Sequence, residues 1–176
     1  MKKNLIMMVV FAVVTVISFG CKKSDNMNYL DYQTYPFEAN GTLTYDGTKY
    51  SVSVSAQKSG DLEIKVKEPT ELCGMTFSII DGKVSISDGK ITEEINDDGY
   101  SAENGILLSR NMFSIPSGAL SGAETTEKNG IKYSKAIYTL PTGEVIVYTQ
   151  TGLSSPDMIE AKLNGHEFSF VFVNEQ

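Results

Sequence analysis

The stretch from Leu62 to Ile95 constrains the fold of this chain more than any other. Its apolar residues stand at every second position, and the dipeptides Asp81-Gly82 and Asp88-Gly89 divide it into short runs. Alternation with a period of two is typical of a strand with one buried face, and Asp-Gly between two such runs is typical of a tight hairpin. The stretch therefore predicts an antiparallel meander with one apolar and one polar face.

The same alternation continues on both sides of this stretch. The further runs are residues 37–45 and 50–56 before it, and 123–128, 132–140, 144–151, 158–163 and 166–173 after it. We therefore expect a mainly β protein with a single antiparallel meander of about ten or eleven strands. A sheet of this size must curl over its own apolar face, which predicts an incomplete barrel.

A different pattern interrupts the strands after residue 95. Asn96-Asp97-Asp98-Gly99 breaks the alternation, and the apolar residues between Ser101 and Phe113 are spaced as on one side of a helix. Ser101 is a plausible N-cap for that helix, and residues 114–122 indicate a second short helix or a loop. We expect these one or two short helices to cover the sheet as a lid.

The N-terminus has the order of an export signal. Lysines follow Met1, an apolar segment runs from Leu5 to Phe19, and Gly20 stands directly before Cys21. Gly20-Cys21 resembles the end of a bacterial lipoprotein signal, in which the cysteine receives a diacylglycerol and carries acyl chains such as palmitate. We expect residues 1–20 to be the signal peptide and Cys21 to be the lipid anchor; an uncleaved N-terminal anchor is the alternative.

Residues 21–36 connect this anchor to the domain predicted for residues 37–176. The segment is polar, with Tyr29, Tyr32 and Tyr35 at every third position. It reads either as a flexible tether or as a short helix that packs its tyrosines on the domain and ends before Pro36. The localisation predicted from the anchor is the extracytoplasmic face of the cell membrane, or the outer membrane if the host has one.

The charge balance excludes one large class of partners. The 176 residues contain 22 acidic and 15 basic side chains, which gives a net charge of −7. Phosphate backbones and anionic headgroups repel such a chain, so we expect no nucleic-acid partner. Membrane attachment then has to come from a lipid on Cys21 or from hydrophobic contact.

The residues that could carry chemistry do not form a recognisable motif. His166 is the only histidine, and it has no serine or cysteine partner in a known arrangement, so it is interpreted as a residue at a strand edge. Acylation of Cys21 would leave Cys73 without a disulfide partner, which suggests a small buried side chain. Asn96-Asp97-Asp98 lacks the ligand spacing of a calcium loop. We expect no catalytic residue, no metal, no cofactor and no enzymatic activity.

The positive signal is apolar surface on one face of the sheet. This surface either fills the interior or lines a hydrophobic cleft under the predicted lid, with a size suited to acyl chains. We expect the chain to act as a monomer. The candidate cleft residues are Val52, Val54, Ile64, Phe77, Ile79, Ile86, Leu108, Phe113, Phe168 and Phe170.

Three blocks of sequence carry a resemblance to a known family. They are EANGTLTYDGTKYSVSV, LEIKVKEPTELCGMTFSIIDGKVSI and TGLSSPDMIEAKLNGHEFSFVFVN. With a helical insertion between two sets of strands, this order resembles the LolA/LolB-like superfamily of bacterial lipoprotein-handling proteins. The resemblance implies a half-barrel whose concave apolar face, covered by helices, holds the acyl chains of a lipid or lipoprotein.

The predicted lipid anchor indicates which members of this family the chain is most similar to. With Cys21 acylated, the chain is similar to the anchored acceptor of the family, or to a lipid-anchored Gram-positive relative that passes lipid on locally. The alternative is an accessory or interaction module of the cell envelope, whose core is filled and which has no lipid ligand.

Overall fold

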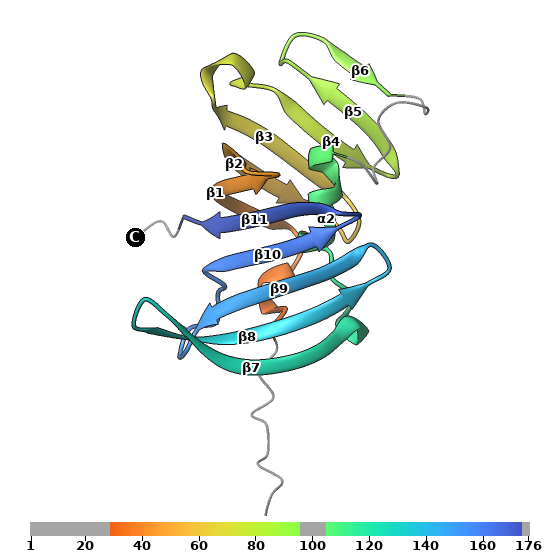
Figure 1. Ribbon diagram of the computed structural model, residues 1–176. Helices are drawn as coiled ribbons and strands as arrows, with labels where there is room; N and C mark the ends of the chain where they lie inside the picture. Colours follow the sequence, from red (N-terminus) through yellow and green to blue (C-terminus); the bar gives the residue numbers. More distant parts are fainter. Residues whose placement is uncertain (1–28, 96–104, 174–176) are drawn as a thin grey trace, which may run out of the picture.

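The computed structural model of the protein describes residues 29–95 and 105–173 (Figure 1). The elements are η1 (Asp31–Gln33), β1 (Phe37–Tyr45), β2 (Thr48–Ala56), β3 (Leu62–Glu68), η2 (Thr70–Leu72), β4 (Thr76–Ile80), β5 (Lys83–Ser87), β6 (Thr92–Glu94), η3 (Gly105–Ser109), α2 (Arg110–Phe113), η4 (Ser117–Ala119), β7 (Leu120–Lys128), β8 (Ile131–Leu140), β9 (Gly143–Gln150), β10 (Met158–Leu163) and β11 (His166–Phe172), where η denotes a 3-10 helix. The residues expected to hold the Ser101 N-cap and the Asn96-Asp97-Asp98 sequence lie outside this description.

The strands form one antiparallel sheet that does not close. The order of its eleven strands is β6-β5-β4-β3-β2-β1-β11-β10-β9-β8-β7. Neighbouring strands in the sheet are therefore consecutive in sequence, except for the pair of β1 and β11. This single long-range pairing joins a meander of six strands to a meander of five. The mainly β class, the single meander and the incomplete barrel expected from the sequence are confirmed.

Asx-Gly dipeptides set the register of four hairpins. The first residue of each has a positive φ, between 45° and 53°, and the glycine that follows is also at positive φ. Asn and Asp tolerate this left-handed conformation, and the resulting turn matches the twist of the two strands it joins. The four turns are Asp46-Gly47, Asp81-Gly82, Asn129-Gly130 and Asn164-Gly165.

The helical insertion differs from the expected single helix. Residues 105–109 form a 3-10 helix and only Arg110–Phe113 form an α-helix. Gly105, the first described residue of this segment, has a φ of 65°, a left-handed conformation that is not part of a right-handed helix. In the part of the chain that the structure describes, no helix has the length and hydropathy needed to cross a membrane.

Cys73 also departs from the expectation, because it is exposed. The alternation of the strands does not extend to this residue. Cys73 directly follows η2 in the connection between β3 and β4, outside the sheet, and its side chain is therefore not part of the core.

A candidate hydrophobic cleft on the concave face

The concave face of the sheet is covered by residues 105–115, which we call the plug. Its first part, η3, contacts β4, and its second part, α2, contacts β10, so the plug reaches both halves of the sheet. Figure 1 shows the strands curling around α2. The apolar side chains of the plug are all buried: Ile106, Leu107, Leu108, Met112, Phe113 and Ile115.

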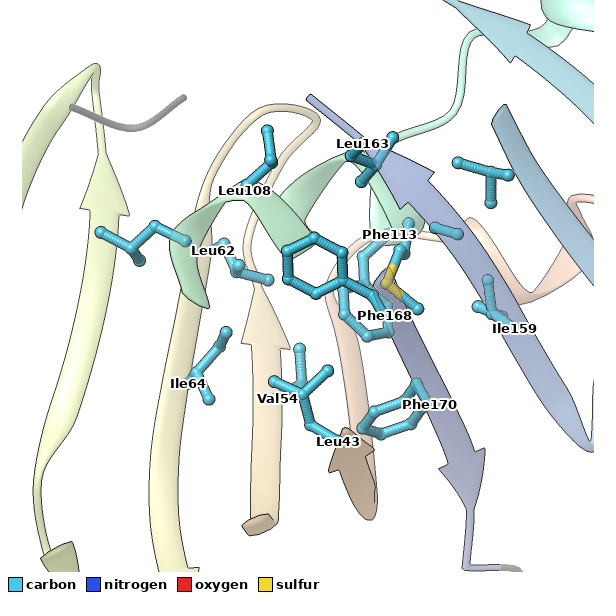
Figure 2. Close-up of a cluster of buried hydrophobic side chains, with 14 of the residues drawn as sticks. Leu43, Val54, Leu62, Ile64, Leu108, Phe113, Ile159, Leu163, Phe168 and Phe170 are labelled. Atoms are coloured by element: carbon cyan, nitrogen blue, oxygen red, sulfur yellow. The ribbon is translucent and has the colours of Figure 1, made fainter. Parts of the chain in front are cut away.

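Most of the predicted cleft residues come together under this plug (Figure 2). Phe77 and Ile86 are half-buried and lie opposite each other on β4 and β5, towards one edge of the sheet. The other eight are buried, with at most 4% of their surface exposed: Val52, Val54, Ile64, Ile79, Leu108, Phe113, Phe168 and Phe170. Leu108 and Phe113 belong to the plug, and the other residues lie on strands, where the pattern of alternation identified one apolar face.

Aromatic rings join the plug to the centre of the sheet. The ring of Phe113 lies 5.1 Å from that of Phe170, edge to face, and 5.6 Å from that of Phe37. Phe170 in turn contacts Phe172, with the ring centroids 4.8 Å apart. The plug therefore occupies the space that a ligand on the concave face would take.

The main grooves lie elsewhere. Among the described residues, one groove has a volume of about 750 Å³, and two smaller ones have about 410 and 540 Å³. Of the ten candidate residues, only Val54 and Phe168 line any of these grooves. With the plug in place, the concave face is filled.

The segment before β1 adds a second cover, which we call the strap (residues 29–36). Tyr29, Leu30, Tyr32 and Tyr35 pack against the core. The sequence is compatible with either a flexible tether or a packed segment. From residue 29 onward, the structure shows the packed segment. The plug and the strap therefore both cover the sheet.

Side chains of the strap hold the backbone of the plug. The Tyr32 hydroxyl donates a hydrogen bond to the carbonyl oxygen of Met112 at 2.9 Å, and the Tyr35 hydroxyl donates one to that of Phe113 at 3.1 Å. The amide of Ile115 donates to Oε1 of Gln33 at 3.1 Å. These are the last carbonyls of α2 and an amide just after it, groups that have no partner within a helix.

The Tyr32 hydroxyl remains a hydrogen-bond donor over the ordinary pH range. Nε2 of Gln33 donates to the Tyr32 hydroxyl at 3.0 Å, which fixes the direction in which the hydroxyl points. Burial raises the pKa of Tyr32 well above its usual value of 10.0. Burial also raises the pKa of Tyr138, on the inner face of β8, to about 12. Both hydroxyls stay protonated.

The plug is not hydrogen-bonded to the sheet as a strand would be. Within the described residues, no backbone–backbone hydrogen bond links residues 105–115 to a strand. Apart from the bonds to the strap, the plug is tied at Ser114, whose Oγ accepts from the amide of Gly60 and shares a hydrogen bond with the hydroxyl of Ser59. Side-chain packing and these few bonds keep the plug in place.

One buried hydroxyl of the plug is left over. Ser109 is fully buried, and its Oγ has no hydrogen-bond partner among the described residues. A buried polar group without a partner costs about 1–3 kcal/mol. This cost lowers the stability of the plug in its packed position on the sheet.

His166 lies away from the plug, at the start of β11. Its Nδ1 is 2.7 Å from Oδ2 of Asp46, so it joins the turn between β10 and β11 to the turn between β1 and β2. Among the described residues, no group of three or more His, Cys, Asp or Glu side chains could hold a metal ion.

Most residues that fasten the plug could not be predicted from the sequence. Gln33 and Ser114 are polar residues with no pattern that marks them. The exceptions are Tyr32 and Tyr35, because their regular spacing in the sequence indicates a segment that could pack on the domain.

Comparisons with known proteins give a distant likeness only. No protein-family model and no curated protein matches the chain. Similar solved structures include the Mycobacterium tuberculosis lipoprotein LppX, with 14% identity, a TM-score of 0.42, and coverage of 77% of this chain and 84% of that one. A LolA superfamily protein from Nitrosomonas europaea has 9% identity, a TM-score of 0.40, and coverage of 84% and 90%.

A lipoprotein-sorting protein domain from Vibrio parahaemolyticus has 8% identity, a TM-score of 0.40, and coverage of 78% and 83%. The LolA superfamily, which the sequence resembles, is thus named among these structures.

Proposed function

We propose that this chain is a lipid-anchored extracytoplasmic protein that binds the acyl chains of a lipid or lipoprotein on its concave face, in the place of the plug. The observation that carries the proposal is the cover of that face. A continuous apolar surface is closed by one short segment that packs its side chains on it but makes no strand-like hydrogen bonds to it.

The hydrophobic effect decides when such a plug can leave. Opening it in water would expose both its own apolar side chains and those of the sheet, at about 25 cal/mol for each Å². An acyl chain that takes its place covers the sheet again, and contributes about 0.8 kcal/mol for each CH₂ group that it buries. The plug is therefore expected to leave only in exchange for an apolar ligand.

The groove of about 750 Å³ is the proposed route to the concave face. It is lined by polar residues of the outer face such as Glu38 and Ser53, but also by Tyr32, Phe37 and Phe172. These three rings belong to the aromatic contacts that continue to Phe113 and Phe170. An acyl chain in this groove would lie directly beside the ligand site.

The anchor would place this route near a membrane. Residues 22–28 separate Cys21 from the strap, and a segment of that length spans at most about 25 Å when fully extended. A lipid on Cys21 would thus keep the domain at the membrane surface, where it would take up or hand over acyl chains locally.

A pair of variants tests the ligand site. Phe77→Asp places a charge on the concave face at a half-buried position, whereas Thr76→Asp places the same charge one residue away, where the side chain points to the other face. Uptake of a fluorescent long-chain fatty acid by the non-acylated domain, residues 24–176, is expected to be lost in Phe77→Asp and kept in Thr76→Asp. Equal uptake by folded samples of both variants would exclude the concave face as the site.

A second function has one observation in its favour, namely that the concave face is filled in the structure. In that case the chain is an accessory or interaction module of the cell envelope and uses its outer surface. The fatty-acid assay separates the two functions, because such a module takes up no probe in any variant.

A further inference from the structure

We infer that the strap is a latch that holds the plug closed, so that the segment next to the lipid anchor controls access to the concave face. The inference rests on the proposed function, because a latch matters only if the plug opens. It concerns residues that neither line the centre of the cleft nor belong to the sheet.

The positions of the hydrogen bonds support a latch. Strap side chains bind three backbone groups of the plug, those of Met112, Phe113 and Ile115, and each bond is made by a different strap residue. The two carbonyls lie at the end of the four-residue helix α2, where a helix cannot satisfy them itself. Release of the strap would leave all three groups without these partners.

Tyr32 connects the latch to the entry route. Its ring lines the largest groove and makes edge-to-face contacts with Phe37 at 6.1 Å and Phe172 at 6.2 Å. Its hydroxyl, at the other end of the same side chain, is the donor to Met112. An acyl chain that enters between these rings displaces Tyr32, and the same movement breaks the bond to the plug.

Ser109 acts in the opposite direction. Its hydroxyl is buried without a partner among the described residues while the plug is closed, and water becomes its partner when the plug opens. The strap therefore stabilises the closed position and Ser109 destabilises it. Conservative substitutions in the strap and at Ser109 should consequently shift the same equilibrium in opposite directions.

Hydrogen exchange of the full chain, reconstituted in phospholipid vesicles, tests the latch directly. A hydrogen bond of ordinary net strength changes an equilibrium constant about two- to tenfold. We expect amides of residues 106–115 to exchange faster by about this factor in Tyr32→Phe and in Tyr35→Phe, and to exchange more slowly in Ser109→Ala. Tyr133→Phe makes the same chemical change on β8, where the ring contacts Tyr148, and should leave these amides unchanged.

Two results would overturn the latch. One is unchanged exchange of the plug in both strap variants. The other is equal acceleration in the plug and in the amides of β9, which would mean that the variants weaken the whole fold and not a local closure.

A second readout separates the latch from the proposed function. A long-chain fatty acid that carries a diazirine, added to the same vesicles, is expected to crosslink to Val54, Ile64 or Phe170 more in Tyr32→Phe than in the unchanged chain, and less in Ser109→Ala. Faster exchange of the plug without crosslinks in any variant would support the latch and contradict the acyl ligand. Crosslinks at equal levels in all variants would support the ligand and contradict the latch.

Discussion

Gly41 shows how closely the concave face is packed at the level of one residue. A Cβ atom on Gly41 would lie 2.5 Å from Cζ of Phe170 and 2.5 Å from the carbonyl oxygen of Val171. The ring of Phe170 therefore rests on the backbone of β1, and only glycine leaves room for it.

Gly41→Ala should lower the free energy of unfolding by about 1–3 kcal/mol, the usual cost of adding a group to a packed core. Gly122→Ala is the matched control, because the nearest atom to its new Cβ would be Cδ1 of Ile137 at 4.0 Å. Urea unfolding followed by circular dichroism measures both. Equal losses in the two variants would contradict the packing of Phe170 on β1.

Asp46 predicts how stability depends on pH. Two hydrogen bonds hold the pKa of this carboxyl below its usual value of 3.8. The one from the backbone N–H of Glu167 has the larger effect, and the one with the His166 side chain has the smaller effect. Because the folded state lowers the pKa, the charged carboxylate stabilises the fold above pH 3.8, and this contribution is lost as the pH falls through the lower folded-state value.

In Asp46→Asn, the turn is kept, since Asn tolerates the positive φ of 45° at this position. The variant should be less stable than the unchanged chain near neutral pH, and the difference should shrink once the pH falls below 3.8. Urea unfolding at a series of pH values measures it. A difference that does not change with pH would show that the charge of Asp46 plays no part.

At the level of elements, the proposed exchange of the plug for a ligand predicts that the plug opens separately from the sheet. Phe113 of the plug and Phe170 of β11 are both buried, with 1% and 0% of their surface exposed, and their rings are in contact. Phe170→Ala should cost about 3–5 kcal/mol, as for other buried rings. Phe113→Ala should cost less, because a plug that opens separately is not needed for the sheet to stay folded.

Urea unfolding followed by a probe of the sheet compares the two variants. Equal losses of stability in Phe113→Ala and Phe170→Ala would mean that the plug unfolds together with the sheet. In that case the exchange of the plug for a ligand would be ruled out as a local event.

The elements also show what could be predicted from the sequence. The strands follow from alternation and from Asx-Gly turns, which are local signals. The apolar spacing of residues 106–113 correctly indicated a covering segment, but these residues form a 3-10 helix followed by a short α-helix and not one continuous helix. The strap could not be decided, because tyrosines at every third position fit a tether as well as a packed segment, and only contacts with a distant part of the chain distinguish the two.

The whole molecule depends on contacts between residues far apart in sequence. The pairing of β1 with β11 joins the two meanders, and the strap meets the plug over about eighty positions. The sequence predicts a curled sheet with an apolar face. Whether that face is open or filled depends on how the plug packs, which no local pattern determines.

The lipid anchor proposed at Cys21 is the feature of the whole molecule that a simple variant tests. When the full chain is produced in a bacterial host fed with an alkyne-bearing fatty acid, we expect label and membrane association, both lost in Cys21→Ser. Cys73→Ser is the control, since Cys73 is exposed and far in sequence from the predicted export signal. Label that persists in Cys21→Ser would contradict anchoring at this cysteine.

Native mass spectrometry of the non-acylated domain, residues 24–176, tests the central claim most directly. After incubation with phospholipid vesicles and removal of the vesicles, a folded monomer is expected to carry an added mass equal to that of one or more acyl-chain lipids. A protein that shows only its own mass, both as purified and after this incubation, would contradict acyl-chain binding on the concave face.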